Sequence, residues 1–275
     1  MTTGSPLKVH VTGVYGLIGN LVYRHLSEQG DQYDVYGSGR RALGSERTDE
    51  RDVVRLPSDR FTIADLSDAE AVSDALKEMD AVLHIGAVPS PDSPFEDVLS
   101  SNIVGTYNVL EACRKWGIKR MVYASSIMVS WGYFKYAEPY RSIREGRLEN
   151  VPDTIPKITL TDLPRPTEPY SASKVWAEGF CRTYSDAHDL SVVCLRIGGV
   201  NKENKCLNPN SASIWCSHRD IVNGLELALK ATVKPTFDIC YIVSESKHRW
   251  VDLENARARL GYVPQDISEE NLATA

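Results

Sequence analysis

The 275-residue sequence has no apolar run close to the roughly 20 residues that a helix needs to cross a bilayer. Its first residues, Met1 to Pro6, contain neither the basic nor the apolar stretch of a secretory signal peptide. No segment repeats itself, and none has low complexity. These absences predict a protein that spans no membrane and has no membrane partner.

The sequence also lacks an excess of positive charge, because 31 Lys and Arg face 37 Asp and Glu for a net charge of −6. Proteins that bind nucleic acid in general rely on basic surfaces, so we expect no such partner. Hydrophobic residues make up 42% of the chain, which is ordinary for a globular protein. A chain of this length can bury a large core in one α/β domain or slightly more.

None of the six cysteines belongs to a Cys-x-x-Cys pair, which argues against a zinc site or a redox motif. Cys113, Cys181, Cys194 and Cys240 instead lie in apolar contexts. Buried free thiols are typical of a reducing compartment. We therefore expect a cytoplasmic protein without a metal ion.

A glycine-rich turn follows the first predicted strand, residues 7–11. The turn reads Thr12-Gly13-Val14-Tyr15-Gly16-Leu17-Ile18-Gly19 and leads into a helical pattern. Such glycines permit a tight turn and a close approach to a pyrophosphate, whose charge the helix N-terminus attracts. A plain strand-to-helix turn that needs glycine is the alternative. The strand–turn–helix context favours a dinucleotide site.

The second predicted strand, residues 33–36, lacks the acid that usually ends this strand in an NAD site and holds the ribose hydroxyls. It is followed by Gly37-Ser38-Gly39-Arg40-Arg41. Ser38 and one of the two arginines offer hydrogen bonds to a 2′-phosphate. We therefore predict NADP as the cofactor, with NAD as the other candidate, although a solvated basic turn would have the same sequence.

Strands alternate with helices along residues 7–197, which predicts an α/β fold with a doubly wound parallel sheet of the Rossmann type. Ligands of such sheets bind at the carboxyl ends of the strands. Several polar or small residues come at such ends: Asp65, Gly86, Ala87 and Ser126. We expect a dinucleotide-binding domain over residues 1–197 and a small substrate-binding region over residues 198–275.

Tyr170 and Lys174 lie four residues apart in a segment with a helical pattern, so a helix stacks both side chains on one face. The pKa of a free tyrosine is about 10, and a nearby ammonium favours the phenolate. A phenol tuned in this way can move a proton to or from a carbinol or carbonyl oxygen. Because Tyr-x-x-x-Lys is also common on surface helices, the pair gains meaning only beside a dinucleotide site.

A long connection, residues 127–169, separates Ser126 from Tyr170. Connections of this length are usually functional or disordered, and this one is too aromatic for plain disorder. Within it, residues 131–165 offer aromatic rings for sugar stacking and arginines for an anionic group. We predict a lid over the substrate; a solvated surface insertion is the alternative.

Together these motifs resemble the extended short-chain dehydrogenase/reductase superfamily, in its NAD-dependent epimerase/dehydratase group. The resemblance covers nearly the whole chain. Besides the glycine turn and the Tyr170/Lys174 pair, it rests on these segments: Ala64-Asp65-Leu66, His84-Ile85-Gly86-Ala87, Asn102-Ile103-Val104-Gly105-Thr106, Ser125-Ser126 and Leu195-Arg196-Ile197-Gly198.

The resemblance implies roles for single residues. Tyr170 is the acid/base, Lys174 lowers its pKa and holds the nicotinamide ribose, and Ser126, or less well Ser125, hydrogen-bonds the reacting oxygen. Asn102 supports a proton relay, its alternative role being structural. Further residues are implied at the dinucleotide: Gly13, Gly16, Leu17, Ile18, Gly19, Ser38, Arg40, Arg41, Asp65, Leu66, Gly86, Ala87 and Ile197. Others are implied at the substrate: Ser126, Met128 and Gly198.

Within the group, the chain is most similar to short sugar dehydrogenases of the uronate dehydrogenase and archaeal glucose-6-phosphate dehydrogenase kind. Their Ser-Ser-Asn-His motif continues here as Ser-Ser-Ile-Met, and their carboxylate-binding arginine falls near Asn210. The resemblance therefore implies hydride transfer between NAD(P) and a carbon of a sugar or polyol, and the two departures speak against uronate itself.

Two other functions compete with this one. A nucleotide-sugar epimerase usually has a larger C-terminal region than residues 198–275, and a non-catalytic NAD(P)-sensing protein usually loses the Tyr/Lys pair. A second apolar stripe on the Tyr170 helix, formed by Trp176, Phe180 and Ala187, predicts a homodimer through this helix and the one over residues 98–116. Burial of the stripe under residues 127–169 is the alternative.

Overall fold

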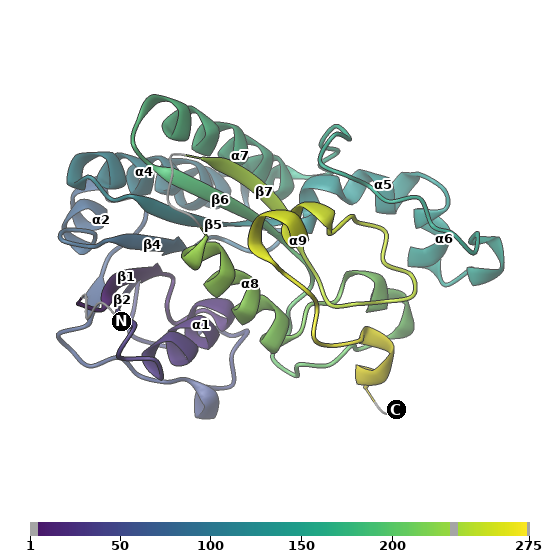
Figure 1. Cartoon of the computed structure of the whole chain (residues 1–275), viewed down its shortest axis with the longest axis horizontal. Coiled ribbons are helices and arrows are strands. Elements are labelled where there is room, and N and C mark those ends of the chain that lie inside the picture. The colour runs from purple at the N-terminus through teal and green to yellow at the C-terminus, as the bar shows by residue number, and fades with distance from the viewer. Residues whose placement is uncertain (1–4, 232–235, 274–275) are drawn as a thin grey trace.

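The computed structural model describes residues 5–231 and 236–273. Their strands form one parallel sheet in the order β3-β2-β1-β4-β5-β6-β7 (Figure 1). The chain runs outwards from β1 to β3, returns to the centre, and continues outwards from β4 to β7, which confirms the predicted doubly wound fold. The strands are β1 (Leu7–Thr12), β2 (Tyr33–Gly39), β3 (Phe61–Ile63), β4 (Ala81–His84), β5 (Arg120–Ser126), β6 (Ser191–Ile197) and β7 (Phe237–Ile242).

Helices cover both faces of the sheet, and each face has its own apolar core (Figure 1). Helices α1, α8 and α9 pack on one face, and α2, α4 and α7 pack on the other. The helices are α1 (Leu17–Ser27), α2 (Ala69–Ala75), α3 (Phe95–Val98), α4 (Gly105–Trp116), α5 (Trp131–Tyr136), α6 (Tyr140–Glu145), α7 (Pro169–Ala187), α8 (His218–Lys230) and α9 (Glu254–Leu260). None of the described helices is long and apolar enough to cross a bilayer.

The central strands are apolar on both sides because both sides are covered. In β6, Val193 and Leu195 contribute to the core under α1 and α8, whereas Val192 and Cys194 contribute to the core under α4 and α7. All seven residues of β6 are buried. Near-continuous apolar runs of this kind are typical of strands in the middle of a parallel sheet.

Two predicted elements have different bounds in the structure. Strand β2 was predicted to end at Tyr36 but continues to Gly39, so Arg40 is the first residue beyond the strand. The helix predicted over residues 98–116 consists of α3, a π-helix over Leu99–Val104 and α4 in direct succession. π-Helical turns within α-helices often occur at functional sites.

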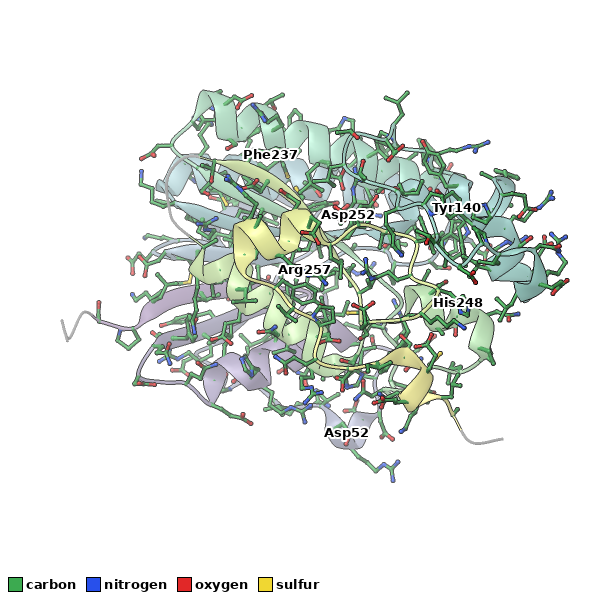
Figure 2. All side chains as sticks on the ribbon, turned by 45° about the vertical axis from the view of Figure 1, so that its right-hand side comes forward. Asp52, Tyr140, Phe237, His248, Asp252 and Arg257 are labelled. Carbon is green, nitrogen blue, oxygen red and sulfur yellow. The ribbon has the colours of Figure 1, made fainter. Side chains whose placement is uncertain are left out.

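The 127–169 connection is ordered and packs against residues near the C-terminus. The ring of Phe134 stacks on that of Trp250 with 5.2 Å between centroids, and Ile158 pairs with Val251 as a parallel β-bridge. In Figure 2, Tyr140 of this segment lies at the same end of the molecule as His248 of the C-terminal region. The segment therefore belongs to a second, smaller layer of structure beside the carboxyl ends of the strands.

Candidate active site

The glycine turn between β1 and α1 is packed so closely that no other residue fits at two of its positions. Gly13 has a φ of +67°, and a Cβ atom there would lie 2.6 Å from the Cα atom of Gly86. A Cβ atom at Gly19 would lie 2.3 Å from the carbonyl oxygen of Gly13. Gly16 is the N-cap of α1 and provides no side-chain cap, so the first N–H groups of the helix face the space above the turn. This arrangement fits the diphosphate of a dinucleotide.

A cavity of about 280 Å³ opens above this turn. It is lined by every residue that the sequence predicts for the glycine turn, the end of β2 and the ends of the next two strands: Gly13, Gly16, Leu17, Ile18, Gly19, Ser38, Arg40, Arg41, Asp65, Leu66, Gly86 and Ala87. We refer to it below as the dinucleotide cavity. The remaining predicted cofactor residues, Tyr170, Lys174 and Ile197, line the adjoining cavity.

The end of the dinucleotide cavity beside β2 and β3 carries both signs of charge. Burial works against the ionised form of Asp65, but hydrogen bonds from Ser67 and the charge of Arg40 outweigh it and lower the pKa of Asp65. The hydroxyl of Ser38 is buried and lies 2.9 Å from Nε2 of His10. No carboxylate among the described residues extends into the cavity from β2, because Asp34 lies near the start of the strand, at the opposite end, and pairs with Arg60.

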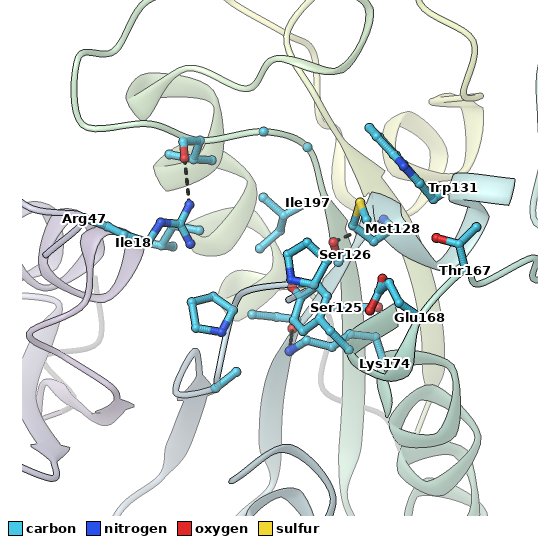
Figure 3. A pocket seen from close by; sticks show the side chains of 18 of the residues that line it. Ile18, Arg47, Ser125, Ser126, Met128, Trp131, Thr167, Glu168, Lys174 and Ile197 are labelled. Atoms are coloured by element: carbon cyan, nitrogen blue, oxygen red, sulfur yellow. Dashed lines mark hydrogen bonds between the residues drawn. The ribbon is translucent and has the colours of Figure 1, made fainter. Parts of the chain in front are cut away.

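A second cavity, of about 620 Å³, lies beyond the ends of β5 and β6 (Figure 3). We refer to it as the substrate cavity. Ser126, the last residue of β5, lines it together with Tyr170 and Lys174 of α7. Helix α7 begins where it does because Glu168 and Ser171 form a capping box, which places Tyr170 in the first turn. The structure thus brings together three of the four residues that the resemblance assigned to catalysis; the fourth, Asn102, does not line this cavity.

Burial shifts the pKa values of both Tyr170 and Lys174. Burial raises the pKa of Tyr170 above its ordinary value, a hydrogen bond with Ser126 and the charge of Arg47 oppose the rise, and Glu168 adds to it. Burial also lowers the pKa of Lys174 from 10.5 to about 8. The two pKa values thus shift in opposite directions, and burial is the largest cause of both shifts.

Lys174 is held by the end of a strand. Its Nζ atom donates a hydrogen bond of 2.7 Å to the carbonyl oxygen of Ala124, and it lies 4.8 Å from the ring centroid of Tyr123 and 5.7 Å from that of Tyr170. The side chain is 3% exposed. Its charge therefore lies next to the backbone of β5, at the floor of the substrate cavity.

Asn102 of the π-helix is buried and uses its amide to hold two other segments. Its Oδ1 atom accepts a hydrogen bond from the N–H group of Val88, and its Nδ2 atom donates to the carbonyl of Val88 and to Oγ of Ser173. These bonds fix the turn after β4 against α7, one residue before Lys174. The contacts favour the structural role of Asn102 that the sequence left open beside the proton relay.

A buried polar network lies behind the serines and was not predicted. Arg196 donates to both carboxylate oxygens of Glu178, at 2.9 and 2.8 Å, and to the hydroxyl of Tyr241. Ser125 donates to Glu178 at 2.6 Å, and Ser130 shares a hydrogen bond with Tyr241. The sequence showed Arg196 only as part of a motif, because which partner a buried charge finds depends on the tertiary fold. This network fixes the turn that carries Ser126.

The outer wall of the substrate cavity differs from the predicted lid. Trp131 and Lys135 line the cavity, as do the two substrate residues Met128 and Gly198. None of the four lid arginines lines the cavity. Arg141, Arg144 and Arg147 pair with Glu138 and Glu145 at the surface. Arg165 lies over the rings of Tyr133 and Tyr136. Trp131 is thus the candidate for the predicted sugar stacking, and the cation that this segment contributes to the cavity is Lys135 rather than an arginine.

Arg47 is the functional candidate that the sequence did not indicate. It belongs to the connection between β2 and β3, which the sequence describes only as a polar segment, and it lines both cavities. Its guanidinium donates a 3.1 Å hydrogen bond to the carbonyl of Val200 (Figure 3). No spacing rule connects a residue in such a segment to the site. Within the described residues, no group of His, Cys, Asp and Glu side chains could hold a metal ion.

Comparison with known proteins gives a consistent result. The model of the NAD dependent epimerase/dehydratase family matches residues 9–243. The NAD-dependent glucose-6-phosphate dehydrogenase of Haloferax volcanii is 31% identical over 95% of this chain and 94% of that enzyme. The L-arabinose 1-dehydrogenase (NAD(P)(+)) of the same organism is 27% identical over 95% of this chain and 97% of that enzyme. A crystal structure of glucuronic acid dehydrogenase from Chromohalobacter salexigens is 29% identical, with a TM-score of 0.76 over 96% of this chain and 86% of that one.

Proposed function

Because the chain belongs to the NAD-dependent epimerase/dehydratase family, we propose that it is an oxidoreductase that uses a nicotinamide dinucleotide and acts on a carbon of a sugar or polyol. The observation that carries this proposal is the joining of two cavities. The glycine turn lies in one, and Tyr170, Ser126 and Lys174 converge in the other. The similarity to sugar dehydrogenases along almost the full length of the chain supports the substrate class.

Three residues of the substrate cavity have separate roles in the proposed reaction. A bound nicotinamide dinucleotide supplies the hydride chemistry. Tyr170 moves the proton of the sugar oxygen, and its raised pKa keeps the phenol protonated at neutral pH, ready to donate. Ser126 hydrogen-bonds the same oxygen and orients it. Lys174, whose pKa of about 8 leaves it charged at pH 7, holds ribose hydroxyls of the cofactor.

We propose NADP rather than NAD as the preferred cofactor. Arg40 and Arg41 line the dinucleotide cavity beyond the end of β2, where no carboxylate of that strand would repel a 2′-phosphate. Ser38 lines the same end, and its hydroxyl can donate to a phosphate oxygen when Nε2 of His10 donates to it. Charged hydrogen bonds contribute about 1.5–3 kcal/mol, which is about a tenfold to hundredfold preference.

The reaction is tested by the absorbance of NAD(P)H across aldoses, polyols, uronates and sugar phosphates. A net change in absorbance is expected for at least one of them, whereas an epimerase recycles its cofactor and a sensing protein produces none. Tyr170→Phe is expected to abolish turnover and to leave cofactor binding intact. Tyr136→Phe, at an exposed tyrosine outside the cavity, is the matched control. Turnover of Tyr170→Phe within tenfold of wild type would refute the role of Tyr170.

The cofactor preference is tested by titrating both dinucleotides into the wild-type protein and the double variant Arg40→Ala/Arg41→Ala. The wild type is expected to bind NADP at least tenfold more tightly than NAD, and the variant should lose most of that difference. Equal or tighter binding of NAD by the wild type would reject the preference, whatever the variant does.

We also propose a homodimer formed through α4 and α7. Leu99, Tyr107 and Trp176 are exposed there, at 40, 45 and 37%, and the ring of Trp176 stacks on that of Phe180 with 4.8 Å between centroids. Contiguous exposed apolar side chains mark association surfaces. Light scattering should give twice the chain mass for wild type and for Tyr136→Glu but the mass of a monomer for Trp176→Glu. A monomeric wild type at micromolar concentration would rule out the dimer.

We propose the predicted division at residue 197, but we assign residues 127–169 to the substrate-binding part instead of the dinucleotide-binding part. The substrate-binding part comprises residues 198–275 together with residues 127–169, because the two stretches pack through Phe134 and Trp250 and because Trp131 and Gly198 line one cavity. Trp131→Ala should raise the Michaelis constant for the sugar; an unchanged constant would contradict this part of the proposal. A cytoplasmic location is supported by six cysteines that are all free and buried.

A further inference from the structure

The dinucleotide cavity and the substrate cavity meet at a narrow set of shared residues. Among the described residues, five line both cavities: Ile18, Arg47, Ile85, Ala87 and Pro89. Four of these have apolar side chains, and only Arg47 carries a charge. The shared residues lie between Ser38 and Asp65 at one end and Tyr170 and Ser126 at the other.

In a dinucleotide that spans the two cavities, the negatively charged diphosphate lies between the adenosine half and the nicotinamide half. Its adenosine half belongs beside the end of β2, and its nicotinamide half belongs beside Tyr170. The diphosphate that joins the halves must therefore cross the region of the shared residues, next to Ile18 in the first turn of α1. The N–H groups of that turn provide partial positive charge there, and Arg47 provides a full one.

Arg47 is held in place by its segment but not neutralised by it. The segment is attached to the glycine turn and α1, because Ser45 donates to the carbonyl of Tyr15 and the side chain of Asn20 exchanges two hydrogen bonds with Val54. Arg51 of the same segment pairs with a carboxylate, whereas no carboxylate in the described part of the chain lies within 4.0 Å of Arg47. The charge of Arg47 is thus available to a ligand.

The guanidinium also touches the substrate-binding part of the protein. It donates to the carbonyl of Val200, which follows β6 and lines the substrate cavity. Its charge acts on Tyr170 across that cavity. An arginine has five N–H groups in a planar fork, so one edge can bond Val200 while the other faces an anion.

We propose that Arg47 binds the diphosphate of the bound dinucleotide and, through Val200, joins the cofactor to the segment that lines the substrate cavity. This inference rests on the proposed dinucleotide chemistry and adds to it a residue outside the glycine turn. We therefore expect the bound cofactor to restrain residues 198–206, which line the substrate cavity through Gly198, Gly199 and Val200.

The test measures the affinity of ADP-ribose by calorimetry, which requires neither turnover nor a known sugar. Arg47→Ala should weaken binding about tenfold, the lower end for a charged hydrogen bond because Arg47 is exposed. Arg47→Lys should recover part of the loss. The matched control Arg51→Ala, from the same segment, should bind as the wild type does. Added salt should weaken the wild type more steeply than Arg47→Ala.

A second measurement tests the connection to Val200. ADP-ribose should lower hydrogen exchange in residues 198–206 of the wild type and of Arg51→Ala, but not of Arg47→Ala. Equal affinities for wild type and Arg47→Ala, or an equal loss in Arg51→Ala, would overturn the assignment to the diphosphate. Equal protection of residues 198–206 in Arg47→Ala would overturn the connection. A wild-type protein that binds neither ADP-ribose nor its 2′-phosphorylated form would overturn the proposed cofactor chemistry and this inference with it.

Discussion

Replacing Lys174 by methionine should abolish turnover and yet stabilise the protein at neutral pH. The side chain is 3% exposed, and burial lowers the pKa of its ammonium from 10.5 to about 8. At about 1.4 kcal/mol for each factor of ten, the charged form costs the native state about 3 kcal/mol at pH 7. Methionine has a similar length, no charge and a flexible apolar chain.

The loss of one hydrogen bond reduces the expected gain. The carbonyl of Ala124 loses its 2.7 Å bond from Nζ, which costs about 1 kcal/mol, so the net gain at pH 7 is about 2 kcal/mol. Because the pKa of this base is lower in the native state, the unfolded chain binds more protons between pH 8 and 10.5. The stability of the wild type therefore gains from this group as the pH rises through that window, and the advantage of the variant disappears.

Urea unfolding at pH 7 and pH 10 measures both parts of this prediction. Lys174→Met should be about 2 kcal/mol more stable than wild type at pH 7 and about equal to it at pH 10. Lys135→Met, at an exposed lysine of the same cavity, should stay within about 0.5 kcal/mol at either pH. A variant that is no more stable at pH 7, or that keeps the same gain at pH 10, would show that Lys174 is not buried with its charge.

Three further substitutions test separate parts of the molecule. Glu178→Ala should cost about 3–5 kcal/mol in urea unfolding, because it leaves Arg196 charged and buried, and changing both residues to methionine should recover most of the loss. Gly19→Ala should weaken ADP-ribose binding at least tenfold in calorimetry, because its Cβ would lie 2.3 Å from a backbone oxygen of the glycine turn. Phe134→Ala should lower unfolding stability by about 3–5 kcal/mol, whereas the exposed Tyr136→Ala should change it by less than about 0.5 kcal/mol.

The fold and the cofactor side of the site could be predicted because both follow from local patterns. Alternating strands and helices determine a doubly wound sheet, and such sheets bring the carboxyl ends of their strands to one edge. Residues as far apart as Gly13, Asp65 and Gly86 therefore line one cavity. The extra length of β2 was missed because Gly37, Ser38 and Gly39 have low strand propensity, and their pairing with β1 and β3 overrides it.

The substrate side could not be predicted to the same depth, since its residues depend on partners far away in the sequence. The sequence shows Trp250 as one aromatic residue among many, and only the fold reveals that it stacks on Phe134 and anchors the 127–169 connection. The arginines of that connection suggested anion binding, but three of the four pair at the surface with glutamates one to nine residues away: Arg141, Arg144 and Arg147. Composition alone does not distinguish a paired cation from a free one.

The pKa values at the centre of the site show the same dependence on context. Spacing alone suggests that Lys174 lowers the pKa of Tyr170, because it treats the lysine as permanently charged. Burial shifts the pKa of the lysine as well as that of the tyrosine, and the charge of Arg47, from a segment with no motif, also acts on the pKa of Tyr170. A buried lysine costs stability, and the nearby ion pair between Arg196 of β6 and Glu178 of α7 helps to hold the helix that carries it against the sheet. The proposed catalytic residues Tyr170 and Lys174 can be recognised from their spacing in the sequence. The burial and the nearby charges that shift their pKa values can be recognised only in the folded protein.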